Sequence, residues 1–499
     1  MTNPTLLVLD YGGPYKELIA RRVRECNVYS RIESGDISVD EIKELSPIGI
    51  ILTGDAASVN DQSVPKCRPE LFELGIPVLG IGYGMHAMTA ALMGRVEPGV
   101  GGKPGRTMAL VDVTCPLFEG LSSDLEVTVE NNEEVTILPR GFENYGRTRT
   151  CQNAVMGERT RGFYGVDFHP EVDGDNGLKM IRNFLYLVCG ASGDYNIVSY
   201  AEQQIEHIRI TVGNDKVMLA LSGGVDSSVC AALLAKALPG QVYCIFVDHG
   251  FLRDNELEDI TAAFKGRPLE LITVDARQQF LDAIAGISDP DEKKAITDRL
   301  FVDIFRAEAK KLGDVKYIAR GTIYTDLVFA HSLQKPRNSA GVRPEEVGYK
   351  GIIEPIADLF KDEVRQLGRK LGLTKEIILR KPFPGLGYAA RIIGEVTPEK
   401  LDILRRADEI FRSELQKTRC QTNQHFALLT DITATDIYGK KGYVLVLRAV
   451  INGDYTLAEY AEIPHRVLAH VSSEITKNID EIVRVVYDIT DASVSRAEW

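Results

Sequence analysis

Short apolar runs recur along the first part of the chain and alternate with stretches of mixed polarity. Tyr15–Cys26 has the spacing of an amphipathic helix, and Leu178–Val188 predicts the helix that closes this unit. Residues Cys189–Asp194 have the composition of a linker. The alternation predicts an α/β layer fold with a largely parallel sheet. The predicted strands are Thr5–Leu9, Gly49–Leu52, Pro77–Ile81 and Phe163–Phe168.

A second α/β pattern follows the linker. Lys216–Leu221 reads as a buried strand, a glycine-rich turn comes next, and Val225–Ala237 has the pattern of a helix. Further strands are predicted at Val242–Val247 and Leu271–Val274. The order of strand, glycine-rich turn, helix and strand is typical of a doubly wound nucleotide-binding sheet.

The tail of the chain, from about Ile392, mixes helix and strand in a different order. A long helix is predicted at Pro398–Lys417, and three strands follow it. We therefore expect a small α+β domain at this end. The predicted strands are Phe426–Leu429, Tyr443–Leu447 and Val483–Ile489.

Composition narrows the class of protein. The chain has 499 residues, which suggests two to four domains, and its net charge of −13 argues against a general grip on nucleic acid or on an anionic membrane. Eight scattered cysteines without a CxxC pair argue against a zinc knuckle or a disulfide framework and favour the cytoplasm. We see no signal peptide and no apolar run near the ~20 residues that span a bilayer.

The most informative stretch is the loop Ser222–Ser228, of sequence SGGVDSS, between a predicted strand and a predicted helix. Two glycines allow the backbone to approach an anion, and the helix start offers free N–H groups. The serine hydroxyls add donors. A carboxylate at Asp226 beside phosphates implies a Mg²⁺ ion. The pattern differs from the Walker A loop, which needs GxxxxGK[ST].

This SGGxDS pattern is the signature of the PP-loop ATP pyrophosphatases, and the chain resembles the GMP synthetase family over nearly its whole length. Further matching runs are Val247–Glu256, Arg320–Tyr324, Asp358–Arg365, Lys381–Gly385 and Leu447–Val450. The resemblance implies a class I glutaminase-like α/β domain at 1–192, a doubly wound PP-loop domain at 195–390, and a small C-terminal α+β dimerisation and acceptor-binding domain at 391–499. It also implies a homodimer.

The resemblance implies a reaction and the residues that serve it. ATP would adenylylate the O2 atom of XMP, pyrophosphate would leave, and ammonia would then attack. Asp226, with Mg²⁺, and Lys361 are the expected catalytic residues; Lys361 could otherwise be a solvated lysine at a helix start. The expected ATP and pyrophosphate site comprises Ser222, Gly223, Gly224, Val225, Asp226, Ser227, Ser228, Asp248 and Arg253. The expected acceptor site comprises Arg320, Gly321, Thr322, Phe383, Gly385, Arg448 and Arg496.

The glutaminase site departs from the family pattern. The family's GxCxG elbow reads Gly80–Gly84 here, with Gly82 in place of the cysteine, and glycine cannot form a thioester. His169 and Glu171 remain, as relics or packing residues. We therefore expect no glutamine hydrolysis, and a domain that either shapes the synthetase or binds another small molecule or protein. Other departures are Asp55, His86, Asn132 and Asp167.

The acceptor half also departs from the family pattern, since Phe329 and Ala492 stand where the family has an acidic residue and a lysine. The expected function is adenylylation of a purine-type carbonyl oxygen, of XMP or a related purine, followed by substitution with ammonia. One alternative is ATP-dependent thiolation, or another substitution, of a modified purine in a specialised pathway. The other is a catalytically silent nucleotide-binding protein. The intact Ser222–Ser228 loop argues against this second alternative.

Overall fold

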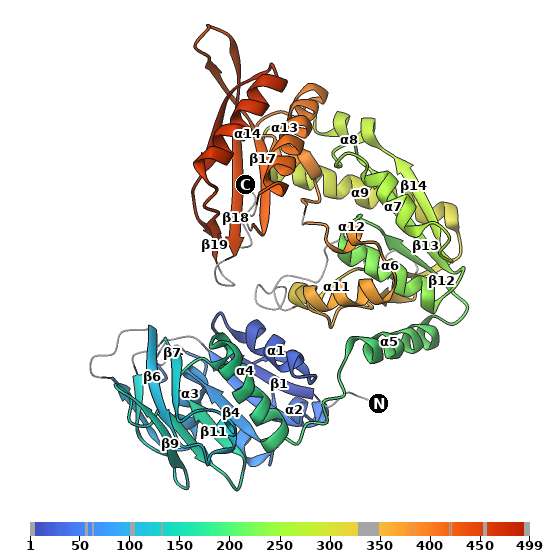
Figure 1. Cartoon of the computed structure of the whole chain (residues 1–499). Helices are drawn as coiled ribbons and strands as arrows, with labels where there is room; N and C mark the ends of the chain where they lie inside the picture. Colours follow the sequence, from blue (N-terminus) through green and yellow to red (C-terminus); the bar gives the residue numbers. More distant parts are fainter. Residues whose placement is uncertain are drawn as a thin grey trace. The chain divides into compact units, whose positions relative to one another are not determined.

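The computed structural model describes residues 5–54, 58–61, 64–99, 105–130, 133–327, 349–381, 383–418, 420, 422–452 and 457–493. The chain forms two compact units, Met1–Asn196 and Ile197–Trp499 (Figure 1). No helix in these described ranges is both long enough and apolar enough to cross a membrane.

The first unit is built on a nine-stranded sheet of order β2-β1-β3-β4-β11-β10-β9-β6-β7. Its parallel half comprises β1 (Thr5–Tyr11), β2 (Tyr29–Ser34), β3 (Gly49–Gly54), β4 (Val78–Ile81) and β11 (Phe163–Val166). The antiparallel half comprises β10 (Val155–Glu158), β9 (Glu143–Thr148), β6 (Gly105–Val111) and β7 (Asp124–Val129). A separate pair joins β5 (Arg95–Pro98) and β8 (Glu133–Ile137). The helices are α1 (Lys16–Glu25), α2 (Val39–Leu45), α3 (Tyr83–Ala91) and α4 (Gly174–Asn183).

The α/β class predicted for this unit is confirmed, but the largely parallel sheet holds for only one half. Strands β6 and β7 alternate between buried and exposed positions, as strands with one solvated face do. Strand β7 contains no continuous apolar run and β6 has only the short run Met108–Val111, and neither strand was predicted.

The second unit begins with α5 (Ile197–Val212) and contains a five-stranded parallel sheet of order β14-β13-β12-β15-β16. From β12 the chain first adds strands on one side and then, from β15, on the other. Ligands in such sheets bind at the carboxyl ends of the strands where this reversal occurs. The predicted doubly wound fold is confirmed. The strands are β12 (Lys216–Ala220), β13 (Val242–Asp248), β14 (Glu270–Asp275), β15 (Val315–Ala319) and β16 (Gly351–Ile353).

Helices cover this sheet, and their ends follow ordinary capping chemistry. Helix α9 begins after Asp289, whose side chain accepts a hydrogen bond from the Glu292 N–H at 2.8 Å, and it ends at Gly313 with a positive φ. The helices are α6 (Val225–Ala237), α7 (Glu256–Phe264), α8 (Arg277–Ala283), α9 (Pro290–Leu312), α11 (Lys361–Lys370) and α12 (Lys375–Ile378).

The tail has the predicted α+β character. Helices α13 (Pro398–Gln416) and α14 (His465–Asn478) accompany a sheet whose central strand, β18, pairs with β17, β19 and β20. Strands β17 and β18 extend well beyond the predicted runs, β17 into polar positions after Leu429 and β18 past Arg448 through the buried Ala449 and Val450. The strands are β17 (Gln424–Thr435), β18 (Lys441–Asn452), β19 (Leu457–Tyr460), β20 (Ile482–Asp488) and β21 (Ala492–Ser493).

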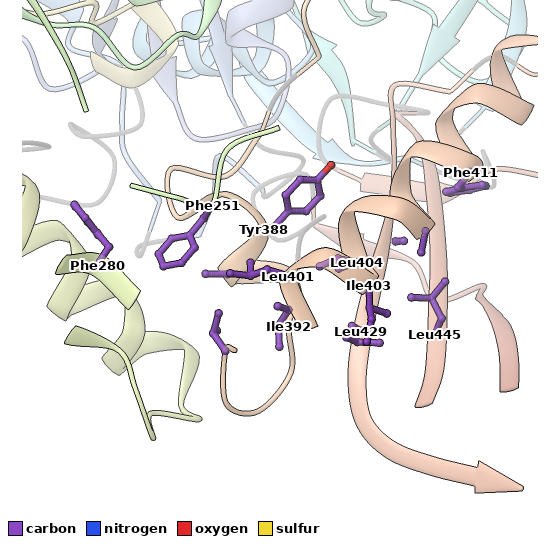
Figure 2. Packing of buried hydrophobic residues seen from close by; sticks show 14 of the residues in the cluster. Phe251, Phe280, Tyr388, Ile392, Leu401, Ile403, Leu404, Phe411, Leu429 and Leu445 are labelled. Carbon is purple, nitrogen blue, oxygen red and sulfur yellow. The ribbon is translucent and has the colours of Figure 1, made fainter. Parts of the chain in front are cut away.

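One apolar core runs across the predicted boundary at residue 390. Phe251 and Phe280 belong to the same buried cluster as Leu404 and Phe411 of α13 (Figure 2). The buried Lys293 on α9 donates hydrogen bonds to the carbonyls of Ile392 at 3.0 Å and of Gly394. Ile197–Trp499 therefore packs as one unit, and the division at residue 390 stays a prediction.

Candidate functional site

The Ser222–Ser228 loop joins the end of the central strand β12 to the start of α6. Gly223 has a φ of +77°, which favours glycine, and Gly224 is the N-cap residue of α6. The hydroxyls of Ser222 and Ser227 lie 3.0 Å apart, and Ser227 donates to the Gly224 carbonyl at 3.2 Å. Backbone N–H groups, a helix start and two hydroxyls therefore meet at the carboxyl edge of the sheet, as an anion site requires. The side chains of Val225 and Ser228 are buried instead.

Asp226 and Lys361 form an ion pair of 2.5 Å between the first turns of α6 and α11. This ion pair holds Lys361 at the loop, so Lys361 is not simply a solvated lysine at a helix start. The other oxygen of Asp226, Oδ1, is buried and has no hydrogen-bond partner within the described part of the chain. Mg²⁺ is usually held by one or two carboxylates together with phosphates and water, so this oxygen fits such an ion.

The Arg320–Thr322 segment packs against the start of α6. A Cβ atom on Gly321 would lie 2.9 Å from the Ser227 backbone nitrogen, so only glycine fits. The Thr322 hydroxyl donates to Glu354 at 2.7 Å. Burial, followed by the charge of Asp226, raises the pKa of the nearby Asp326. The structure thus places this segment, predicted for the acceptor, beside the phosphate loop.

A cavity of about 740 Å³ lies in the same unit, and Arg253 is one of its lining residues. The Arg253 guanidinium stacks 4.1 Å from the ring centre of Phe383 and donates to the Lys381 carbonyl at 3.2 Å. Burial lowers the pKa of Arg253 to about 10. Arg391 stacks on the rings of Phe383 and Phe426 at 4.9 and 4.4 Å. The lining of the cavity therefore combines arginine side chains with the ring of Phe426, and acidic side chains lie among them.

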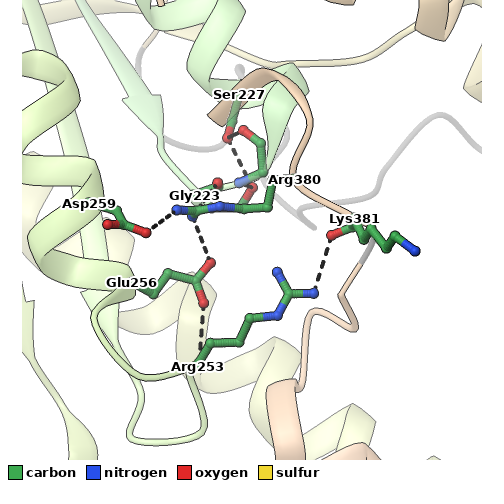
Figure 3. A network of polar contacts seen from close by, with 9 residues as sticks. Gly223, Ser227, Arg253, Glu256, Asp259, Arg380 and Lys381 are labelled. Carbon is green, nitrogen blue, oxygen red and sulfur yellow. Dashed lines mark hydrogen bonds and ion pairs between the residues drawn. The ribbon is translucent and has the colours of Figure 1, made fainter. Parts of the chain in front are cut away.

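A buried network connects the cavity wall to the phosphate loop (Figure 3). Arg380 donates to the Gly223 carbonyl at 3.0 Å and contacts Glu256 at 3.1 Å. Sequence reasoning singled out neither Arg380 nor Glu256, and it also missed Asp326 and Glu354. The available signal for Arg380 was its place directly before the matching Lys381–Gly385 run.

The remaining predicted residues lie apart from this network. Asp248 ends β13, accepts the Gly250 N–H at 2.9 Å and lies 3.7 Å from Arg277. Arg448 is buried and ion-paired with Asp488 of the neighbouring strand. Burial opposes ionisation of Asp488, but hydrogen bonds from Thr490 and the charge of Arg448 lower its pKa. A Cβ atom on Gly385 would meet open space. Arg496 and Phe329 lie outside the described residues.

The first unit retains the frame of a nucleophile elbow without its nucleophile. Gly82 follows β4 with φ +53° and ψ −117° and caps α3. A Cβ atom there would lie 2.9 Å from His169 Nε2. His169 Nδ1 lies 2.8 Å from Glu171 Oε1, and both side chains are buried. Burial opposes protonation of His169, but the Glu171 charge outweighs it and raises its pKa.

Two of the departures noted in the sequence are partners in space. His86 Nε2 lies 2.9 Å from Asp167 Oδ1, and both residues are buried. Glu133 lies 3.9 Å from the other imidazole nitrogen. A carboxylate beside a buried imidazole satisfies both polar groups, which explains how the two replacements are accommodated together. Asp55 and Asn132 lie outside the described residues.

Comparison with known proteins covers the whole chain. Three family models match: Glutamine amidotransferase class-I over residues 7–188, NAD synthase over 197–295, and GMP synthase C terminal domain over 409–499. The chain is 43% identical to the GMP synthase [glutamine-hydrolyzing] of Treponema denticola, over 99% of the chain and 96% of that protein. The chain belongs to the GMP synthase family. It is accordingly a ligase of the ATP-pyrophosphatase type.

Other members of the family are equally similar in extent. The GMP synthase [glutamine-hydrolyzing] of Acetivibrio thermocellus is 44% identical, with complete coverage of both chains. That of Caldanaerobacter subterraneus is 42% identical over 99% of each chain. The similarity therefore extends over both units. It includes the glutamine amidotransferase part as well as the part that contains the phosphate loop.

Proposed function

We propose that the protein adenylylates a purine-type carbonyl oxygen with ATP and then substitutes it with ammonia, with XMP as the first candidate acceptor. The observation that carries this proposal is the Asp226–Lys361 ion pair at an intact phosphate loop. End-to-end similarity to GMP synthases supports the same chemistry. ATP and Mg²⁺ are the proposed cosubstrate and cofactor.

The proposed reaction makes a poor leaving group into a good one. The acceptor oxygen attacks the α-phosphorus of ATP, an O–P bond forms, and the bond to pyrophosphate breaks. Ammonia then adds to the activated carbon, and AMP departs with the oxygen while a proton is lost from nitrogen. Lys361 is proposed to offset charge on the departing pyrophosphate. Asp226 Oδ1 would hold Mg²⁺, which when bound neutralises phosphate charge.

We propose that the cavity beside Arg253 receives the acceptor. The lining guanidinium groups and the ring of Phe426 suit a planar, anionic purine nucleotide, since rings stack and guanidinium groups bind phosphate. Of the predicted acceptor residues, Phe383 supports this assignment through its contacts with the lining residues Arg253 and Arg391. Arg320, Gly321 and Thr322 are proposed to act at the phosphate loop side. A homodimer built through the C-terminal part and a cytoplasmic location remain proposals.

We further propose that this chain hydrolyses no glutamine. Thioester formation needs a side-chain nucleophile, and Gly82 has none. His169 Nε2 also lies within 2.9 Å of the point where such a side chain would begin. The relatives bear the name glutamine-hydrolyzing, so the chain would depend on free ammonia or on another source of it.

The test is to incubate the full chain with Mg-ATP, ammonium and XMP, and to measure AMP, pyrophosphate and GMP. GMP from ammonium, with none from glutamine, is the expected result. Parallel reactions contain xanthosine and related purines, and sulfide in place of ammonium. Product formed only with sulfide would favour thiolation. A folded protein that binds ATP but releases no pyrophosphate with any acceptor would contradict the proposal and favour a silent nucleotide-binding protein.

A further inference from the structure

We propose that Arg380 and Glu256 form a positioning pair that fixes the phosphate loop and couples it to the neighbouring cavity. The inference rests on the proposed function, because it assigns the loop to the phosphates of ATP. Both residues belong to the second unit, on and near helices α7 and α12, and their contact spans 124 residues of sequence.

Arg380 contacts the phosphate loop directly. The side chain of Arg380 is only 10% exposed, and its Nη1 donates to the Gly223 carbonyl at 3.0 Å. This carbonyl and the Gly224 N–H belong to one planar peptide unit and point in opposite directions. Anchoring the carbonyl on Arg380 therefore turns the Gly224 N–H away from the arginine, toward Ser222, whose hydroxyl accepts it at 3.4 Å.

Glu256 forms an ion pair with Arg380. Glu256 is 6% exposed, and its Oε1 lies 3.1 Å from Arg380 Nη1. A Cβ atom on Gly223 would lie 3.1 Å from the same oxygen, so the carboxylate is packed directly against the loop. A buried carboxylate is stable only with such partners, and it holds the guanidinium in one orientation. Asp259 takes the outer nitrogen of Arg380 at 2.9 Å on the solvent side.

Glu256 and Arg380 are also linked to Arg253 and Lys381 (Figure 3). The second oxygen of Glu256 accepts the Arg253 backbone N–H at 3.3 Å. The Arg253 side chain then donates to the carbonyl of Lys381, which directly follows Arg380. Arg253, Lys381 and both members of the pair, Glu256 and Arg380, line the cavity. A ligand in the cavity therefore acts on the pair directly as well as through Arg253 and Lys381, and thermodynamic linkage makes the effect reciprocal.

The first experiment measures MgATP binding by calorimetry without any acceptor. Arg380→Lys keeps the charge but loses the planar fork that reaches three oxygens. We expect the MgATP dissociation constant to rise about tenfold or more, since a charge-assisted hydrogen bond is worth about one to two decades of affinity. Glu256→Gln should do the same. Glu258→Gln, an exposed position on the same helix, is the matched control and should bind MgATP as the unaltered protein does.

The second experiment repeats the titrations with saturating XMP as the cavity probe. In the unaltered chain XMP should change the MgATP dissociation constant, and in Glu256→Gln this ratio should move toward one. A purely structural role would lower the melting temperature without changing the ratio. The inference is overturned if folded Arg380→Lys binds MgATP within twofold of the unaltered chain. The proposed coupling to the cavity is overturned if XMP leaves the MgATP affinity of the unaltered chain unchanged. The titration without XMP measures MgATP binding alone and needs no turnover. A failure to form GMP would therefore contradict only the proposed function.

Discussion

His169 Nε2 lies 2.9 Å from the point where a Cβ atom on Gly82 would stand. The imidazole thus occupies the space next to the missing nucleophile, and Glu171 holds it there at 2.8 Å. Any side chain at position 82 must displace a ring that is fixed on its other side. The space beside Gly82 is therefore filled by the imidazole, and a cysteine at this position would require the His169 ring to move.

We predict that Gly82→Ala lowers the free energy of unfolding by about 1–3 kcal/mol, because a non-glycine residue with φ +53° is strained and also meets His169. Gly174→Ala is the matched control, since Gly174 has φ +61° and open space around it. Urea unfolding should give the larger loss for Gly82→Ala, and His169→Ala should reduce that difference. Equal losses at the two glycines would show that the imidazole contact carries no energy.

A pH dependence follows from the His169–Glu171 pair. The pKa of His169 is raised in the folded protein, so protonated His169 stabilises the fold. That stabilisation is fully present below the unfolded pKa of about 6.5 and is lost as pH rises through the folded value. Urea unfolding of the unaltered chain and of His169→Gln, compared from pH 5.5 to 9, should show the largest difference at low pH. A difference that grows with pH would contradict the ion pair.

Lys361 and Asp226 give a sharper test of the chemical step. We expect Lys361→Met to lower kcat for pyrophosphate release about 10²–10³-fold, the range seen when a preorganised electrostatic contact is lost. Asp226→Asn should also raise the Mg²⁺ concentration needed for half-maximal rate. Lys375→Met, at the exposed start of α12, is the control. Unchanged kcat in Lys361→Met, with normal stability, would remove Lys361 from the mechanism.

The parts of this site that could be predicted from sequence are contiguous or belong to matching runs. The Ser222–Ser228 loop directly follows a predicted strand and runs into a predicted helix, and Lys361 lies in a second matching run. The Arg380–Glu256 contact has no local pattern, because folding alone brings the two residues together. The same holds for His86 and Asp167, two separate departures that prove to be neighbours. The antiparallel strands β6 and β7 were missed because half of each faces solvent.

Arg253 was predicted to contact the phosphates of ATP, but it lines the cavity and its guanidinium stacks on Phe383. A role of Arg253 at the phosphates of ATP and a role at the acceptor predict different kinetics. If Arg253 binds the phosphate of the acceptor, Arg253→Gln should raise the KM for XMP about tenfold or more and leave the KM for MgATP within about threefold, because a charge-assisted bond to phosphate is lost. The KM for xanthosine, which lacks that phosphate, should change little. A rise confined to the KM for MgATP would return Arg253 to the ATP site, whereas equal rises for XMP and xanthosine would indicate that its role is to hold Phe383 in place.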